Sequence, residues 1–177
     1  KSLPGSNCKP RQYELGSEHI TMSSWYCPLP FKHAYIDSTG VAVCCQTPRQ
    51  PVSLETWPEN PYLKKIQSQL LQGQVPLECQ NCVQQEKTQG RSLRTDAIKD
   101  YNNQRFVETQ IDFVDYRSNN ICNFKCRTCD PVFSHGIANE VKNSDTLQRF
   151  FKPIDTKTVH VTEENANWVA KNIDTIK

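Results

Sequence analysis

The stretch that most constrains this chain runs from Asn120 to Pro131 and holds three closely spaced cysteines. Cys122, Cys126 and Cys129 are separated by three and then two residues, and they follow a β-branched, aromatic segment typical of a strand. Three thiolates on one loop can ligate three metal atoms of a single inorganic core, whereas a cubane iron–sulfur cluster takes four ligands. The spacing therefore predicts a cluster with one iron open to a ligand that the protein does not supply.

The remaining cysteines also favour metal ligation over disulfide bonds. The 177 residues include nine cysteines, and an odd number cannot pair completely. Cys79 and Cys82 stand two residues apart, a spacing that suits metal ligation in a reducing compartment. Cys8 stands alone in a polar N-terminal stretch, and we interpret it as a free cysteine.

Charge and hydropathy patterns argue against nucleic-acid and membrane partners. The formal net charge of +2 comes from interspersed acidic and basic residues, so no basic block marks a nucleic-acid footprint. No run approaches the ~18 apolar residues that a membrane-crossing helix needs, and no signal-peptide pattern is visible. We expect a globular, cytoplasmic protein whose partners are neither membranes nor nucleic acids.

Local patterns predict a β-hairpin followed by helices. Apolar and polar residues alternate over 31–36, and a turn containing Gly40 leads into a short apolar strand that ends at Cys44 and Cys45. Capping residues, prolines and glycines then bound a series of amphipathic segments. We expect a helical turn over 53–57, helices over 61–72, 83–87 and 92–102, a strand over 109–117, and helices from 131 through 141 and from 162 onward.

The three-cysteine loop resembles the signature of radical S-adenosylmethionine (SAM) enzymes, in which such a loop follows the first strand of a partial β/α barrel. The resemblance implies that Cys122, Cys126 and Cys129 are the catalytic residues and hold a 4Fe-4S cluster whose open iron binds SAM. It implies reductive cleavage of SAM to a 5′-deoxyadenosyl radical, which abstracts a hydrogen atom from a substrate. A small electron donor such as flavodoxin or ferredoxin is the implied partner.

Three further residues of the loop are expected to lie near the cofactor. Asn123 is expected to brace the loop, as asparagine does in turns, together with Asn119 and Asn120. Phe124 is expected to shield the cluster from water, which would tune its potential. Thr128 stands where the family often has an aromatic residue near the adenine of SAM.

A second resemblance lies upstream of the loop. The order Cys27-Pro-Leu-Pro-Phe, Gly40, Cys44-Cys45, Trp57, Cys79-x-x-Cys82 and Gly90-Arg-Ser-Leu-Arg looks like the auxiliary-cluster segment of the SPASM/twitch group of radical SAM proteins. The resemblance implies a second 4Fe-4S cluster held by Cys27, by one of Cys44 and Cys45, and by Cys79 and Cys82. Relatives in this group often act on peptides, so a peptide is the substrate class that the resemblance implies.

The expected fold is α/β and has three parts. An irregular segment covers 1–24, an α+β hairpin-plus-helices cluster module covers 25–105, and 106–177 form the first βα unit of a partial (β/α)6 TIM-like barrel. In radical SAM enzymes the next strand carries a Gly-Gly-Glu turn that binds SAM, and these 177 residues do not contain it. We therefore expect a chain that continues past Lys177, that is completed by another chain, or that is inactive alone.

Two other functions remain compatible with these cysteines. A hairpin with a Cys-x-x-Cys is how zinc ribbons are built, so the upstream cysteines also fit a zinc-stabilised binding module without catalysis. At the downstream loop zinc would need a fourth ligand, for which His135 is the nearest candidate. An iron–sulfur electron-transfer partner of a complete enzyme is the third possibility.

Overall fold

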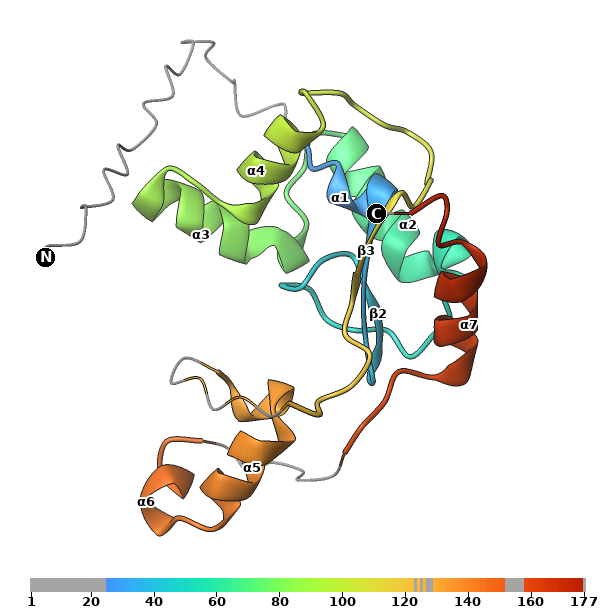
Figure 1. Ribbon diagram of the computed structural model, residues 1–177. Coiled ribbons are helices and arrows are strands. Elements are labelled where there is room, and N and C mark those ends of the chain that lie inside the picture. The colour runs from blue at the N-terminus through green and yellow to red at the C-terminus, as the bar shows by residue number, and fades with distance from the viewer. Residues whose placement is uncertain (1–24, 123, 125, 127–128, 152–157, 177) are drawn as a thin grey trace, which may run out of the picture.

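The computed structural model describes residues 25–122, 124, 126, 129–151 and 158–176, which form a mixed α/β fold around a small sheet (Figure 1). The irregular segment expected over 1–24, with Cys8, lies outside the described residues. The helices are α1 (Leu29–Lys32), α2 (Pro61–Leu71), α3 (Gln80–Gln89), α4 (Leu93–Asp100), α5 (His135–Lys142), α6 (Asp145–Gln148) and α7 (Glu163–Lys171), with the 3-10 turns η2 (Trp57–Glu59), η3 (Leu77–Cys79) and η4 (Pro131–Phe133). The strands are β1 (His33–Asp37), β2 (Gly40–Ala42) and β3 (Phe113–Tyr116).

The sheet has the strand order β2-β1-β3. β1 and β2 form the predicted antiparallel hairpin, and β1 also pairs in parallel with β3, with His33 opposite Phe113. The hairpin turn requires glycine because Gly40 has a φ of +136°, and a Cβ there would lie 2.0 Å from the carbonyl oxygen of Gln50. The sheet thus joins the segment upstream of residue 105 to the strand that leads into the three-cysteine loop.

The predicted first strand was wrong at its start. Phe31 and Lys32 belong to α1, and the backbone N–H of each donates to the carbonyl oxygen of Pro28. Pro30 stands in the first turn of this helix, where its fixed φ suits the helix and its missing N–H costs nothing. The extended backbone therefore begins only at His33.

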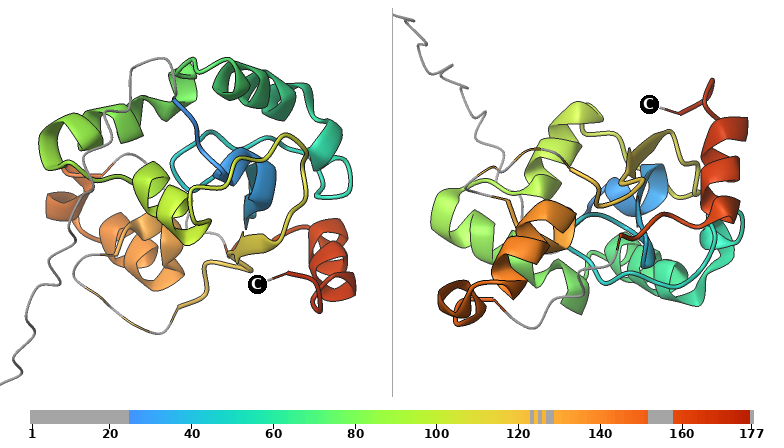
Figure 2. Two further views of the ribbon diagram at one scale, coloured as in Figure 1. Left: turned by 90° about the horizontal axis from the view of Figure 1, so that it is seen from above. Right: turned by 60° about the horizontal axis from the view of Figure 1, so that its bottom comes forward.

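The two faces of the sheet have different roles. Ala34 and Ile36 of β1 and Val114 of β3 point into the hydrophobic core, whereas His33 and Phe113 lie on the opposite face. Figure 2 shows α2 and α7 beside one face of the sheet and α4 beside the other. The buried core contains Leu54, Trp57, Leu63, Ile66 and Leu70, with Trp168 and Val169 of α7 packed against it.

Most predicted helix boundaries are confirmed to within a few residues, because local caps set them. The side chain of Asn60 accepts a hydrogen bond from the N–H of Tyr62 at the start of α2, and Thr162 caps α7. Ser92 and Thr95 form a capping box at the start of α4. The helix expected from residue 83 begins three residues earlier, at Gln80.

The helix expected from residue 131 is divided in two. Asp130 caps the short turn η4 by accepting from the N–H of Val132, and the buried Ser134 then caps α5.

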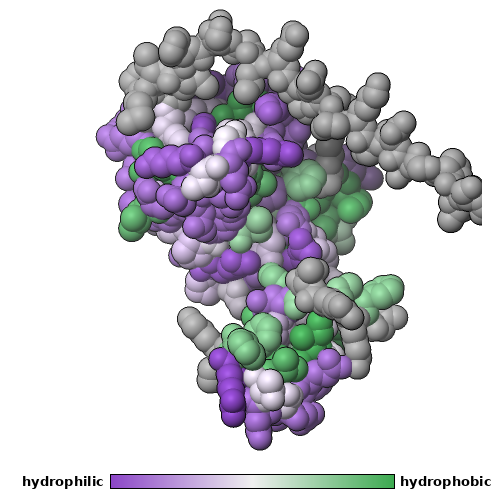
Figure 3. Space-filling model, turned by 90° about the vertical axis from the view of Figure 1, so that its left-hand side faces the viewer, coloured by the Kyte–Doolittle hydropathy of each residue, from purple (hydrophilic) through white to green (hydrophobic). Residues whose placement is uncertain are grey.

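Figure 3 shows hydrophobic side chains gathered at the lower end of the molecule, over α5 and α6. Exposed apolar residues of this region include Phe124, Val132, Phe133 and Phe150. The assignment of β3 and α5 to the start of a barrel stays a prediction.

Candidate functional site

Four of the predicted ligands surround one small hollow. Cys27 precedes α1, Cys44 follows β2, Cys79 ends η3 and Cys82 lies in the first turn of α3. All four line the same hollow and all are free thiols, and Cys27, Cys44 and Cys82 are buried. The rest of the wall is largely apolar, with contributions from Leu29, Pro30, Val43, Ile66 and Leu93.

Local structure explains how each thiol reaches the hollow. Thr47 closes a tight turn after β2, because its hydroxyl donates to the Cys44 carbonyl oxygen and accepts from the Cys44 N–H. The three-residue step from Cys79 to Cys82 is close to one helical turn, which places both residues on one face of the chain. The turn after β2 and the first turn of α3 therefore place these cysteines at the hollow.

The thiols of the quartet raise one another's pKa values. Burial raises the pKa of Cys44 to about 11, and the Cys45 and Cys82 thiols add to this increase. The pKa of Cys79 rises to about 12, through burial and the neighbouring Cys44 and Cys82. The pKa of Cys27 is also raised well above its ordinary value, first by burial and then by the other three cysteines. Since metal ligation needs thiolates, a bound cation would reverse this balance.

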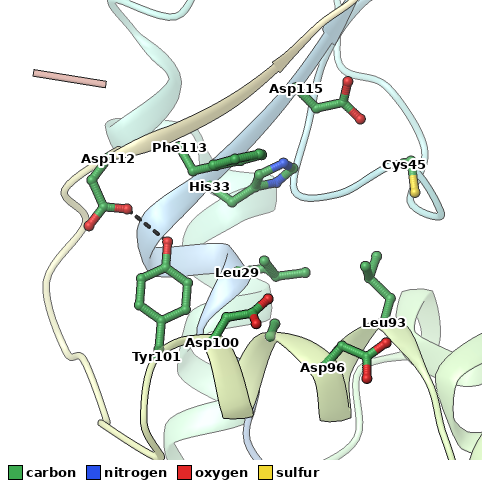
Figure 4. A pocket seen from close by; sticks show the side chains of 11 residues that line it. Leu29, His33, Cys45, Leu93, Asp96, Asp100, Tyr101, Asp112, Phe113 and Asp115 are labelled. Carbon is green, nitrogen blue, oxygen red and sulfur yellow. Dashed lines mark hydrogen bonds between the residues drawn. The ribbon is translucent and has the colours of Figure 1, made fainter. Parts of the chain in front are cut away.

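The structure distinguishes the two adjacent cysteines. Cys45 is exposed and lines a different cavity, on the face of the sheet that carries His33 and Phe113 (Figure 4). Cys44 alone of the pair lines the hollow with the other three cysteines. The geometry thus favours Cys44 as the third member of the quartet.

Sequence reasoning missed a buried ion pair that ties the quartet together. Arg94 of α4 donates two hydrogen bonds to the Glu86 carboxylate of α3, at 2.9 and 2.6 Å, and a third to the carbonyl oxygen of Tyr26 at 3.0 Å. These bonds join the helix of Cys82 to the residue that precedes Cys27. Arg94 belongs to the Gly90-Arg-Ser-Leu-Arg motif, which was the available signal.

Two polar atoms near the hollow have no hydrogen-bond partner among the described residues. They are the buried hydroxyl oxygen of Tyr62 and the buried Oε2 of Glu78. Burial, followed by the charges of Glu78, Cys44 and Cys79, raises the pKa of Tyr62 to about 12. A buried hydroxyl beside thiols normally needs an acceptor, so Tyr62 is a candidate donor to a sulfur ligand.

The four sulfur atoms of the quartet are suitable ligands for an iron–sulfur cluster, but the hollow between them is small. The hollow measures about 20 Å³, which is room for one ion or one water molecule. A four-iron cubane is larger, so the thiols would have to move apart to hold one. Across the described residues, no three His, Cys, Asp or Glu side chains are arranged around a single metal position.

The downstream loop brings its three cysteines near one another. The N–H of Cys129 donates to the carbonyl oxygen of Cys126 at 3.1 Å. The pKa of Cys129 is raised by desolvation and then by the neighbouring thiols of Cys122 and Cys126 and by Asp130. Cys126 is exposed, and Cys122 and Cys129 are partly exposed. The three predicted ligands of the SAM cluster therefore lie close enough to affect one another and are accessible to solvent, but among the described residues they are not arranged around one metal position.

Asparagines brace this loop as the sequence predicted. The Asn119 side chain accepts from the N–H of Ile121 at 2.8 Å. The buried Asn120 accepts from the N–H of Val159 through its side chain and from the N–H of His135 through its carbonyl oxygen. The loop is thus fixed to the start of α5 and to the segment before α7.

Of the three residues expected near the cofactor, the structure describes Phe124 alone. Asn123 and Thr128 lie outside the described residues, so their predicted roles stay predictions. Phe124 is 69% exposed and shields nothing in the described part of the chain. The Nε2 atom of His135 is 3.0 Å from the Asn139 amide nitrogen, whereas its buried Nδ1 has no partner among the described residues.

Comparison of the chain with family models, with curated proteins and with solved structures finds no match. Within the described residues, no helix has both the length and the apolar character needed to traverse a bilayer. Geometry and chemistry of the cysteine sites are therefore the basis for a functional conclusion.

Proposed function

We propose that this chain carries the cluster-binding elements of a radical SAM enzyme, namely a twitch-like auxiliary module and the first βα unit of a partial barrel. The observation that carries the proposal is the loop after β3, which holds Cys122, Cys126 and Cys129 within eight residues and in which the Cys129 N–H donates to the Cys126 carbonyl oxygen at 3.1 Å. Three thiols on one loop suit a 4Fe-4S cluster with one open iron. Cys126 is exposed and Cys122 and Cys129 are partly exposed, so SAM could reach a cluster held by them from the solvent.

In this proposal the chain positions the cofactors and its thiols give up their protons to the metal. The hydrogen bonds of Asn119 and Asn120 hold the loop at the end of β3. When bound, the cluster supplies the electron that splits SAM into methionine and a 5′-deoxyadenosyl radical. Flavodoxin or ferredoxin would deliver that electron in the cytoplasm, and a peptide is the proposed substrate class.

The quartet of Cys27, Cys44, Cys79 and Cys82 is proposed to hold the auxiliary 4Fe-4S cluster. Four cysteines are the usual ligand set for such a cluster, and apolar walls limit the access of water to it. The Arg94–Glu86 ion pair holds two parts of the quartet together. Electron relay and substrate ligation are both compatible with this position.

A zinc site at the quartet is the second candidate, and the small size of the hollow favours it. A volume of about 20 Å³ suits one ion, and the four thiols would have to turn toward a common point to bind it, because they are not so arranged among the described residues. Tetrahedral zinc bound by four cysteines is a common structural site. In that case the quartet would stabilise the module and take no part in electron transfer.

Anaerobic reconstitution with iron and sulfide tests the proposal. We expect about eight irons per chain, as two 4Fe-4S clusters require, and a change in the electron paramagnetic resonance spectrum of the reduced protein when SAM is added. Replacing Cys122, Cys126 and Cys129 together by alanine is expected to remove about half of the iron and the whole SAM response. Replacing Cys27 and Cys82 is expected to remove the other half and to leave the SAM response.

Several outcomes would count against parts of the proposal. Tightly bound zinc at the quartet, with about four irons at the loop, would support the zinc alternative there. Iron that shows no response to SAM would support the electron-transfer alternative. A protein that binds no iron through Cys122, Cys126 and Cys129 would exclude the radical SAM function.

A further inference from the structure

A second cavity lies on the face of the sheet away from the hydrophobic core. It has a volume of about 460 Å³, which is within the usual range for small-molecule sites. Residues of β1, β3 and α4 line it, with Cys45 at one side (Figure 4). Its apolar wall is made of Leu29, Leu93, Ala97 and Phe113.

His33 presents an unused hydrogen-bond acceptor at this cavity. The residue is only 8% exposed, and its ring stacks on that of Phe113 with 5.3 Å between centroids. Its Nδ1 lies 2.8 Å from the carbonyl oxygen of Val43. A carbonyl only accepts, so Nδ1 carries the hydrogen and the neutral ring has its lone pair on Nε2. Burial lowers the pKa of His33 and so favours the neutral ring, and no described residue hydrogen-bonds to Nε2.

The other polar groups of the cavity are also acceptors. Four carboxylates line it, and its lining contains neither lysine nor arginine. The Tyr101 hydroxyl uses its hydrogen to donate to Asp112 at 2.8 Å. Asp100 forms no ion pair with a described residue, while three of the carboxylates pair with side chains outside the lining. These three pairs are Asp96–Arg91, Asp112–Lys32 and Asp115–Arg117.

We propose that this cavity binds an alkylammonium or guanidinium group on an apolar stem, such as a lysine or arginine side chain of a peptide. The N–H of the cation donates to Nε2 of His33, the stem packs on Leu29 and Leu93, and the carboxylates supply the opposite charge. An apolar ligand of the same shape would leave Nε2 unpaired, and an anionic ligand would be repelled by the carboxylates. The assignment of this ligand as the substrate of a radical step rests on the proposed function, whereas the binding itself does not.

Calorimetric titration of the full chain tests the inference. The ligands are Nα-acetyl-lysine methylamide, Nα-acetyl-arginine methylamide and Nα-acetyl-norleucine methylamide, the last being an uncharged analogue of the lysine compound. We expect at least one cationic compound to bind about tenfold or more tightly than the norleucine compound, because a charged hydrogen bond is lost. Equal binding of all three, or no binding of either cation at millimolar concentration, would overturn the proposal.

Two variants locate the binding. His33→Asn keeps a side-chain N–H for the Val43 carbonyl oxygen but removes Nε2, and we expect about tenfold weaker binding. The double change Asp100→Asn with Asp115→Asn removes charge from the cavity and is also expected to weaken binding. Glu164→Gln on the exposed side of α7 is the control and should leave the affinity unchanged. Thermal unfolding of each variant verifies its fold.

The outcomes separate this inference from the proposed function. If His33→Asn does not fold, the double variant Asp100→Asn with Asp115→Asn tests the site instead. An unchanged affinity of that variant for the cationic compounds would contradict the proposed site. Measuring bound iron in the same samples allows the two proposals to be tested separately. Cation-selective binding by a chain that takes up no iron would support the cavity and reject the radical SAM function, and the reverse result would do the opposite.

Discussion

The Arg94 guanidinium pairs with the Glu86 carboxylate at 2.6 Å while lying 3.8 Å above the ring of Trp25. Both charged side chains are largely buried, with exposures of 11% and 18%. One residue of α4 thus connects the helix of Cys82 to the segment that leads into Cys27.

Replacing Arg94 by glutamine is expected to destabilise the fold by about 2–3 kcal/mol, because it leaves the buried Glu86 carboxylate without its counter-ion. Urea unfolding followed by circular dichroism measures this loss. Arg91→Gln is the matched control, since Arg91 pairs with Asp96 at the surface with 74% of its side chain exposed. That change is expected to cost less than about 1 kcal/mol. Equal losses in the two variants would show that the buried pair has no special role.

Cys44→Ser and Cys45→Ser are expected to differ in their effect on the auxiliary site. Cys44 lines the hollow with Cys27, Cys79 and Cys82, whereas Cys45 faces the other cavity. After anaerobic reconstitution, we expect Cys44→Ser to lose the metal of the quartet and Cys45→Ser to keep it. Metal analysis of both variants checks this, and loss only in Cys45→Ser would reverse the assignment.

Tyr62→Phe is expected to keep the auxiliary cluster and to lower its reduction potential. The buried Tyr62 hydroxyl, beside Cys44 and Cys79, has no partner among the described residues and is the proposed donor to a sulfur. A hydrogen bond to sulfur stabilises the added electron, so its removal makes reduction harder. Redox titration followed by electron paramagnetic resonance measures the potential. A value equal to that of the unchanged chain would mean that the hydroxyl does not contact the cluster.

Asp37 predicts a specific pH dependence of stability. Burial alone would raise its pKa, but hydrogen bonds from Thr39 and the nearby Arg49 outweigh burial and lower it. Because the folded pKa is below the unfolded value of about 3.9, the carboxylate contributes stability above that pH and loses it as the pH falls through the folded pKa. Asp37→Asn should therefore be less stable than the parent chain at pH 7.

Thermal unfolding at several pH values tests this expectation. The difference in Tm between the parent chain and Asp37→Asn should shrink as the pH is lowered below about 4. A difference that stays constant down to about pH 2 would mean that the charge of Asp37 does not stabilise the fold.

Local chemistry explains which elements could be predicted from the sequence. The starts of α2, α4 and α7 depend on the side chains of Asn60, Ser92 and Thr162, which bond to backbone N–H groups two or three residues away. Such signals are contained in short stretches of sequence. The hairpin and the bracing role of Asn119 were predicted for the same reason.

Features that depend on distant contacts were not visible in the sequence. Two adjacent cysteines look equivalent, and only the turn closed by Thr47 directs Cys44 to the hollow. The cavity at His33 arises because β1 pairs in parallel with β3, which lies eighty positions later in the chain. No local pattern specifies that register.

This parallel pairing has a consequence for how the protein is made. Ribosomes release a chain from its N-terminus, so β1 emerges with β2 but waits for β3 before its second edge is hydrogen-bonded. His33 and the quartet are therefore assembled on a sheet that is unfinished until Tyr116 has been synthesised. A nascent chain stalled shortly before β3 would leave one edge of β1 without hydrogen-bond partners, although all four cysteines of the quartet would already have been synthesised.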